Sequence, residues 1–156
     1  MLTINQSAPN FSLYDAHDIL HKLDDYKGHW LVIYFYPKDN TPGCTKEACA
    51  LRDNSAKFED LNTRIIGIST DNSKSHLNFS QNQNLNFTLL ADPKGEVSKA
   101  YEALFKLGPV KFSKRHSFII DPTGKIAKIY RSVSPSTHSQ ELIDDLQQLQ
   151  AEFNRQ

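Results

Sequence analysis

The run from Trp30 to Tyr36 is the feature that most limits how this chain can fold. Its residues are all aromatic, β-branched or aliphatic, and Pro37 ends it, because proline has no N–H to donate within a sheet. Such a run is typical of a strand buried on both faces, with other structure packed above and below. It falls well short of the ~20 apolar residues of a membrane-spanning helix. We therefore predict a central strand and no membrane partner.

Helical and strand patterns alternate after this strand. Strands are predicted at residues 64–69, 88–91, 117–121 and 125–131, and helices at residues 41–61, 73–82, 96–105 and 137–153. Pro122-Thr123-Gly124 predicts a tight turn, and residues 11–13 and 19–23 predict an N-terminal edge hairpin. This order favours an α/β fold in which a central mixed β-sheet is flanked by helices, in a single domain over residues 1–156.

Charge and cysteine content exclude several classes of protein. The chain has 18 basic and 18 acidic residues, so its formal net charge of zero gives no footprint for nucleic acid or a membrane surface. The first residues have neither the basic nor the apolar region of a signal peptide, which leads us to expect a cytoplasmic location. Two cysteines, Cys44 and Cys49, are too few for a disulfide-stapled scaffold, and redox chemistry is the expected use of the pair.

Cys44 is the candidate nucleophile on position alone. It falls in the first turn of a predicted helix, just beyond the carboxyl end of the central strand, where ligands tend to bind in α/β sheets. Unpaired N–H groups and the helix dipole favour a thiolate there. The alternative is a small buried hydrophobic residue.

Thr41 and Pro37, which precede Cys44, each have a structural and a functional interpretation. The hydroxyl of Thr41 is placed either to cap the helix or to bond an oxygen held against the sulfur. Pro37 either only ends the strand or also shields an oxidised sulfur.

The pattern Pro-x-x-x-Thr-x-x-Cys formed by Pro37, Thr41 and Cys44 resembles the active-site signature of the peroxiredoxins. The segment 43–53, with its second cysteine five positions after the first, is similar to the bacterioferritin comigratory protein or peroxiredoxin Q subfamily. The opening Ala-Pro-Asn-Phe-Ser-Leu at residues 8–13 departs from that subfamily only by Asn10 in place of aspartate, and residues 115–125 match its arginine-containing strand and turn.

The resemblance implies a thioredoxin-like fold with an N-terminal β-hairpin and a thiol peroxidase activity on hydrogen peroxide and organic hydroperoxides. Cys44 is then the peroxidatic nucleophile, which becomes a sulfenic acid, and Thr41 orients the peroxide. Arg115 stabilises the thiolate and the transition state, although for an isolated arginine a surface ion pair is the safer interpretation. Pro37 shields the pocket. Glu47, three positions after Cys44, could orient that arginine, but it is left out of this set because an exposed acidic residue in a first helical turn is also explained by the helix dipole.

Cys49 is, by the same resemblance, the resolving thiol that forms a disulfide with Cys44; the alternative is a core thiol, with resolution left to an external thiol. Residues five apart on an α-helix have Cα atoms about 8.7 Å apart, more than the roughly 7 Å that a disulfide tolerates. If one helix holds both cysteines, it must unwind locally before the bond can form.

The resemblance further implies recycling by thioredoxin or a similar dithiol, no cofactor and a monomer. No metal is expected, since His17 and His21 have helical ligand spacing but fall in the predicted hairpin. A peroxide sensor that passes its disulfide to a partner protein remains the alternative. A thioredoxin-type disulfide reductase is disfavoured because such enzymes use Cys-x-x-Cys.

Overall fold

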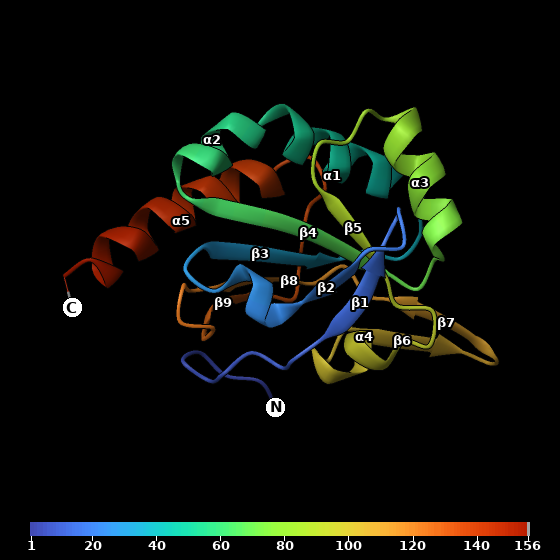
Figure 1. Ribbon diagram of the computed structural model, residues 1–156, viewed down its shortest axis with the longest axis horizontal. Helices are drawn as coiled ribbons and strands as arrows, with labels where there is room; N and C mark the ends of the chain where they lie inside the picture. The colour runs from blue at the N-terminus through green and yellow to red at the C-terminus, as the bar shows by residue number, and fades with distance from the viewer. Residues whose placement is uncertain (156) are drawn as a thin grey trace.

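The computed structural model describes residues 1–155 and consists of a seven-stranded mixed sheet, a separate two-stranded sheet and helices packed against the larger sheet (Figure 1). The strands are β1 (Ser12–Asp15), β2 (Leu20–Lys22), β3 (Trp30–Phe35), β4 (Thr63–Ser69), β5 (Thr88–Ala91), β6 (Leu104–Leu107), β7 (Val110–Ser113), β8 (Ser117–Ile120) and β9 (Ile126–Tyr130). The helices are the short η1 (Leu23–Tyr26) and α1 (Pro42–Asp53), α2 (Ser55–Asp60), α3 (Ser73–Asn82), α4 (Glu96–Ala100) and α5 (His138–Phe153).

The predicted central strand is β3, and all six of its residues are buried. The order of the large sheet is β2-β1-β5-β4-β3-β8-β9. β3 pairs in parallel with β4, from Trp30 opposite Thr63 to Phe35 opposite Ile68, and antiparallel with β8 on its other side. The mixed sheet and the N-terminal hairpin of β1 and β2 are therefore confirmed, and the carboxyl ends of β3 and β4 lie at one edge of the sheet.

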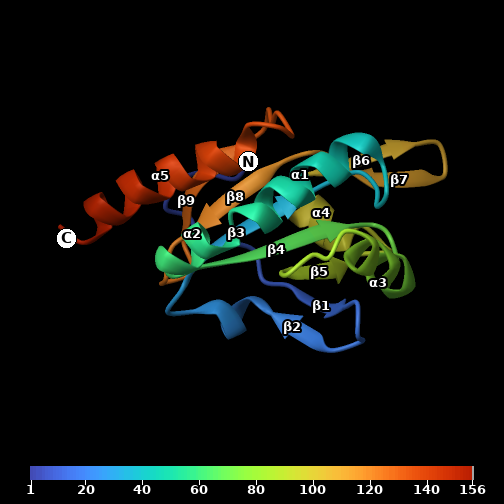
Figure 2. The same ribbon diagram turned by 90° about the horizontal axis from the view of Figure 1, so that it is seen from above.

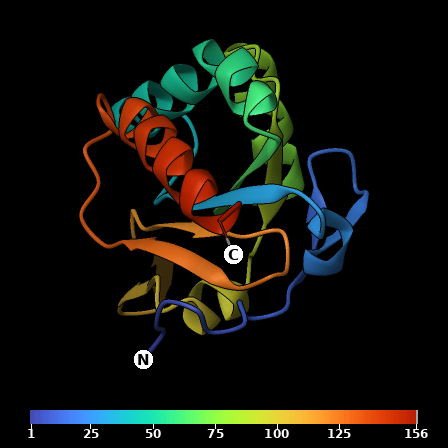
Figure 3. The same cartoon turned by 90° about the vertical axis from the view of Figure 1, so that its left-hand side faces the viewer.

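The two faces of the sheet are covered unequally. Helices α1, α2, α3 and α5 lie on one face, and α4 with the N-terminal segment lies on the other (Figures 1, 2 and 3). Alternate β3 residues enter two cores: Val32 and Tyr34 face the four longer helices, whereas Leu31 and Ile33 face α4 and the N-terminal segment. A strand with two buried faces is what its unbroken apolar run predicts.

Gly67 in β4 is required by the packing of the helical face. A Cβ at this position would lie 2.8 Å from two ring atoms of Tyr34 and 2.9 Å from a methyl of Leu89. Only a residue without a side chain lets these two large groups meet over the strand.

Two predicted helices are shorter than their patterns suggest. The predicted helix 41–61 is interrupted at Asn54, which separates α1 from α2. The predicted helix 96–105 ends at Ala100, because Glu102 has a φ of 59° that no α-helix accommodates. Leu104 then starts β6, which pairs with β7 through the Gly108-Pro109 turn.

Candidate active site

Cys44 lies in the first turn of α1, at the edge of the sheet where β3 and β4 end. Thr41 occupies the N-cap position in an extended conformation, and Pro42 is the first helical residue, so Cys44 is the third. The thiol is buried, with 1% of the residue exposed. The first N–H groups of a helix have no intrahelical acceptor, so this end of α1 favours a negatively charged sulfur.

Arg115 is brought to this thiol from just before β8. Its Nη2 donates to Sγ of Cys44 at 3.2 Å, and its Nη1 donates to Oε1 of Glu47 at 2.8 Å. Burial opposes the charge of the guanidinium, but the hydrogen bond and charge of Cys44, followed by those of Glu47, raise the pKa of Arg115. The fold thus joins Cys44 and Arg115, which lie 71 positions apart in the chain.

Glu47 belongs to the same cluster, and its expected exposure is wrong. The side chain is 1% exposed, because position 47 lies three residues after Cys44 on the face of α1 that packs on the sheet. Burial raises the pKa of this carboxyl to about 7, although Arg115 acts in the opposite direction. Its Oε2 is buried without a hydrogen-bond partner among the described residues. The spacing of three residues between Cys44 and Glu47 is the sequence signal that places both side chains on the same face of α1.

Two further residues shape the space around the guanidinium. A Cβ on Gly43 would lie 3.2 Å from Nη2 of Arg115, so a larger residue here would press on the group that touches Cys44. Tyr34 points its hydroxyl into the same interior without a partner in the part of the chain that is described. Burial, and then the charges of Glu47 and Cys44, raise the pKa of Tyr34 well above its usual value, which keeps this hydroxyl protonated.

Thr41 and Pro37 lie in the loop that joins β3 to α1. The Thr41 hydroxyl does not cap the helix; Oγ1 donates to the carbonyl of Lys38 at 2.8 Å. Because that bond uses its proton, the hydroxyl oxygen keeps lone pairs that can accept a hydrogen bond. Pro37 is half-buried at the start of the loop.

Cys49 is held away from Cys44 in this structure. Both cysteines are free thiols on the intact α1, Cys44 buried and Cys49 half-buried. Sγ of Cys49 donates to Oε1 of Gln83, the C-cap residue of α3, at 3.5 Å. The helix therefore does hold both cysteines, which is the condition under which a disulfide requires local unwinding.

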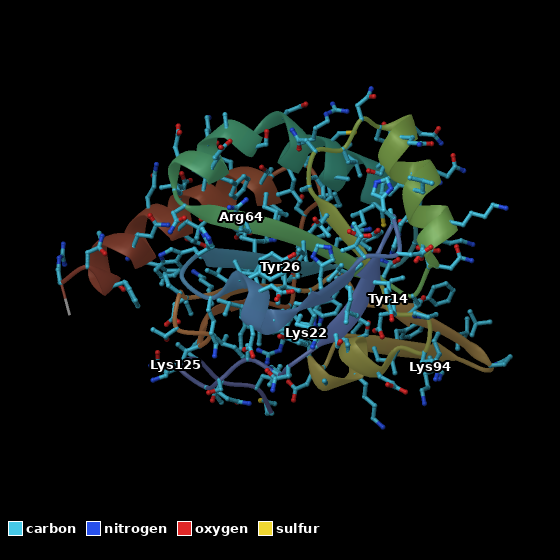
Figure 4. All side chains as sticks on the ribbon, in the orientation of Figure 1. Tyr14, Lys22, Tyr26, Arg64, Lys94 and Lys125 are labelled. Atoms are coloured by element: carbon cyan, nitrogen blue, oxygen red, sulfur yellow. The ribbon has the colours of Figure 1, made fainter. Side chains whose placement is uncertain are left out.

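Other hollows and titratable clusters are separate from Cys44. A hollow of about 760 Å³ includes Tyr26, Arg64 and Phe87 in its lining, and Figure 4 labels the first two. Of His17 and His21, which have ligand spacing but were not expected to bind a metal, His21 bonds Asp15 and Tyr26.

One group of potential metal ligands is found within residues 1–155, namely Asp39, Asp71 and His76, with ligand atoms within 4.8 Å of one another. Asp39 and His76 already bond each other, and the second ring nitrogen of His76 bonds the carbonyl of Leu90. The group is therefore a closed hydrogen-bond network rather than an open coordination site. No helix among the described residues has the length and apolar character needed to cross a bilayer.

The sequence and the fold are both similar to known proteins. Residues 4–129 match the AhpC/TSA family. The chain is 39% identical over 154 residues to peroxiredoxin Bcp of Bacillus subtilis, an alignment that covers 95% of this chain and 97% of that protein. It is 40% identical over 147 residues to the chloroplastic peroxiredoxin Q of Oryza sativa subsp. japonica, covering 92% of this chain and 66% of the plant protein.

Among solved structures, a PrxQ variant from Xylella fastidiosa superimposes with a TM-score of 0.88 at 31% identity, covering 94% of this chain and 96% of that one. The bacterioferritin comigratory protein of Xanthomonas campestris, whose alkyl peroxide reduction activity has been analysed structurally, superimposes with a TM-score of 0.83 at 31% identity, over 88% of this chain and 90% of that one. The thioredoxin-like fold expected from the sequence is confirmed by these similarities.

Proposed function

Because this chain belongs to the AhpC/TSA family, among the peroxiredoxins of the Bcp and peroxiredoxin Q kind, we propose that it reduces hydrogen peroxide and organic hydroperoxides at Cys44. The observation that carries the assignment of residues is the hydrogen bond from Arg115 to Sγ of Cys44 at 3.2 Å. A permanently charged donor aimed at a buried sulfur stabilises the thiolate, which is the reactive form.

The first step is a two-electron oxidation of sulfur. The Cys44 thiolate attacks the terminal oxygen of the peroxide, the O–O bond breaks, and the remaining oxygen leaves as an alcohol or water after taking a proton. Thr41 has lone pairs left to accept a hydrogen bond from the peroxide. The second guanidinium contact, to Glu47, fixes Arg115 so that Nη2 stays directed at the reacting atoms. Pro37 closes the loop side of the pocket.

The second step is proposed to join Cys44 and Cys49. The thiolate of Cys49 attacks the sulfur of the Cys44 sulfenic acid, an S–S bond forms, the S–O bond breaks, and the departing hydroxide takes a proton from solvent and leaves as water. Cys49 must first release Gln83, and the part of α1 between the cysteines must unwind. We propose that thioredoxin or a similar dithiol then donates two electrons and two protons to regenerate the thiols, and that the protein works as a cytoplasmic monomer.

Stoichiometric oxidation of three proteins tests this cycle. Reduced wild type, Cys44→Ser and Cys49→Ser are each mixed with one equivalent of hydrogen peroxide, and thiol loss and mass are followed. We expect a rapid Cys44–Cys49 disulfide in wild type, no fast reaction in Cys44→Ser, and a sulfenic acid that dimedone traps in Cys49→Ser. Wild type that reacts no faster than an ordinary exposed thiol would refute the peroxidase assignment.

Catalytic turnover separates an enzyme from a sensor. Wild type is supplied with excess peroxide, thioredoxin, thioredoxin reductase and NADPH, and NADPH consumption is followed. We expect many peroxide molecules to be reduced per protein. Arrest after a single equivalent, with the disulfide intact, would contradict recycling by thioredoxin and favour the sensor.

A further inference from the structure

A network centred on the buried side chains of Tyr36, Asp39 and His76 fastens the loop between β3 and α1. The Asp39 carboxylate accepts three hydrogen bonds, from the Tyr36 hydroxyl at 2.6 Å, the Ser75 hydroxyl at 2.8 Å and Nδ1 of His76 at 2.7 Å. The backbone N–H of Asp39 donates to Oδ2 of Asp71 at 2.8 Å. Asp39 is 5% exposed and His76 is 0% exposed. A proline alone is enough to end a strand, so these four hydrogen bonds at Asp39 are not needed to end β3.

The protons of the pair can be counted from its partners. Nε2 of His76 lies 3.0 Å from the carbonyl of Leu90, which can only accept, so Nε2 carries a hydrogen. One further proton lies between Nδ1 and the Asp39 carboxylate. Wherever that proton sits, the pair as a whole is neutral, and every nitrogen of the ring is used. Such a pair is strongly destabilised when one member is removed, because the other is left buried without its partner.

The partners of Asp39 come from a part of the fold that does not include α1. Tyr36 directly follows β3, Asp71 lies between β4 and α3, and Ser75 and His76 belong to α3. In contrast, Cys49 bonds Gln83, the C-cap residue at the opposite end of α3, and disulfide formation must break this bond. The anchor at Asp39 is therefore independent of the helix that has to unwind, although Thr41 at the end of the loop accepts a backbone bond from Thr45 of α1.

We propose that Asp39 and His76 are positioning residues, which hold the loop 37–41 in its peroxide-binding geometry through the whole cycle while α1 unwinds and refolds. The proposal rests on the proposed peroxidase function. Thr41 lies two residues after Asp39, and Cys44 three residues after Thr41, so the anchored position of Asp39 controls where the Thr41 hydroxyl lies relative to the sulfur. Because the anchor does not involve α1, it governs the reaction with peroxide and leaves the resolving step untouched.

The test measures these two steps separately. In stopped-flow experiments the reduced protein is mixed with hydrogen peroxide, and the second-order rate of Cys44 oxidation and the first-order rate of disulfide formation are obtained from wild type, His76→Leu and His76→Gln. We expect His76→Leu to lose about ten- to a hundredfold in the first rate, the size of loss that a displacement of about 1 Å causes. His76→Gln, which keeps a side-chain donor, should recover part of that loss. The second rate should stay within about twofold of wild type.

His138→Leu is the matched control. His138 is also buried, at 1% exposed, and both of its ring nitrogens are bonded, to Ser117 and Glu141, but it lies in α5. Its replacement removes a comparable buried ring, and we expect a loss of stability with little change in either rate. A decrease in the peroxide rate of the same size in His138→Leu would show that general destabilisation is responsible and would overturn the proposal.

Two other outcomes would also overturn it. One is a folded His76→Leu that reacts with peroxide as fast as wild type, and the other is a disulfide step slowed as much as the peroxide step. If His76→Leu does not fold, Asp39→Asn and His76→Gln are judged by the same criteria. Slow oxidation of wild type itself would instead refute the proposed function, so the two failures are distinguishable.

Discussion

Glu47 makes the stability of this fold depend on pH in a direction opposite to that of most carboxylates. Burial raises its pKa from the ordinary 4.5 to about 7 in the folded protein. Between these values the folded protein keeps a proton that the unfolded chain has released. The corresponding stabilisation is complete below pH 4.5 and is lost as the pH rises through about 7.

The size of the effect follows from the two pKa values. Their difference corresponds to about 3 kcal/mol in the free energy of unfolding, at about 1.4 kcal/mol for each tenfold change in proton affinity. Most of this change falls between pH 5 and 8. Glu47→Gln is uncharged at every pH and can still accept a hydrogen bond from Arg115, so it removes the titration while keeping the shape of the site.

Urea unfolding of reduced wild type and Glu47→Gln at several pH values between 5 and 8 measures the effect. The free energy of unfolding of wild type minus that of the variant should fall by about 2 to 3 kcal/mol over this range. Burial lowers the pKa of His116 and of His138, which makes stability rise with pH, but both proteins share these groups and the difference cancels them.

Glu59→Gln, at an exposed position of α2, is the control for the loss of one carboxyl group from a helix. A flat difference for Glu47→Gln would mean that Glu47 is ionised in the folded protein throughout this range. The ion pair with Arg115 would then outweigh the cost of burial, and the reasoning would be refuted.

Two other substitutions have defined outcomes. Arg115→Lys should lower kcat/KM for peroxide by about a hundredfold, since one ammonium cannot contact Cys44 and Glu47 in the geometry of the two guanidinium nitrogens. Steady-state kinetics measures this, and an unchanged kcat/KM would contradict the role of Arg115. Gly67→Ala should lower the free energy of unfolding by about 1 to 3 kcal/mol, because its Cβ would lie 2.8 Å from the Tyr34 ring. If urea unfolding gave the same stability as wild type, the ring would move aside at no cost.

The parts of the fold that the sequence predicts well are those where one local signal dominates. The unbroken run before Pro37 places β3, and residues 73–82 and 88–91 are predicted with the bounds of α3 and β5. The end of α4 could not be predicted, because it depends on the left-handed conformation of Glu102, a residue type with no preference for it. The hairpin of β6 and β7 follows from that break.

The candidate site divides in the same way. Cys44 and Arg115 could be selected because they belong to motifs of a known family, and their contact is then found in the structure. Glu47 was considered as a partner of Arg115 but left out of the site, because its burial is a tertiary property that the charge of the residue hides. The pairing of Asp39 with His76 joins residues 37 positions apart, and no spacing rule within one helix or strand indicates it.

The antiparallel pairing of β3 with β8 also determines when Cys44 acquires its surroundings during synthesis. Leu31 of β3 pairs with Ile120 of β8. Arg115, whose guanidinium contacts the sulfur, follows Cys44 by 71 positions in the chain. A ribosome-bound chain that has exposed only its first hundred residues contains Cys44 but not Arg115. We expect the nascent thiol to react as slowly as any cysteine in an unfolded peptide, so that sensitivity to peroxide begins only when the second half of the chain has emerged and the sheet has closed.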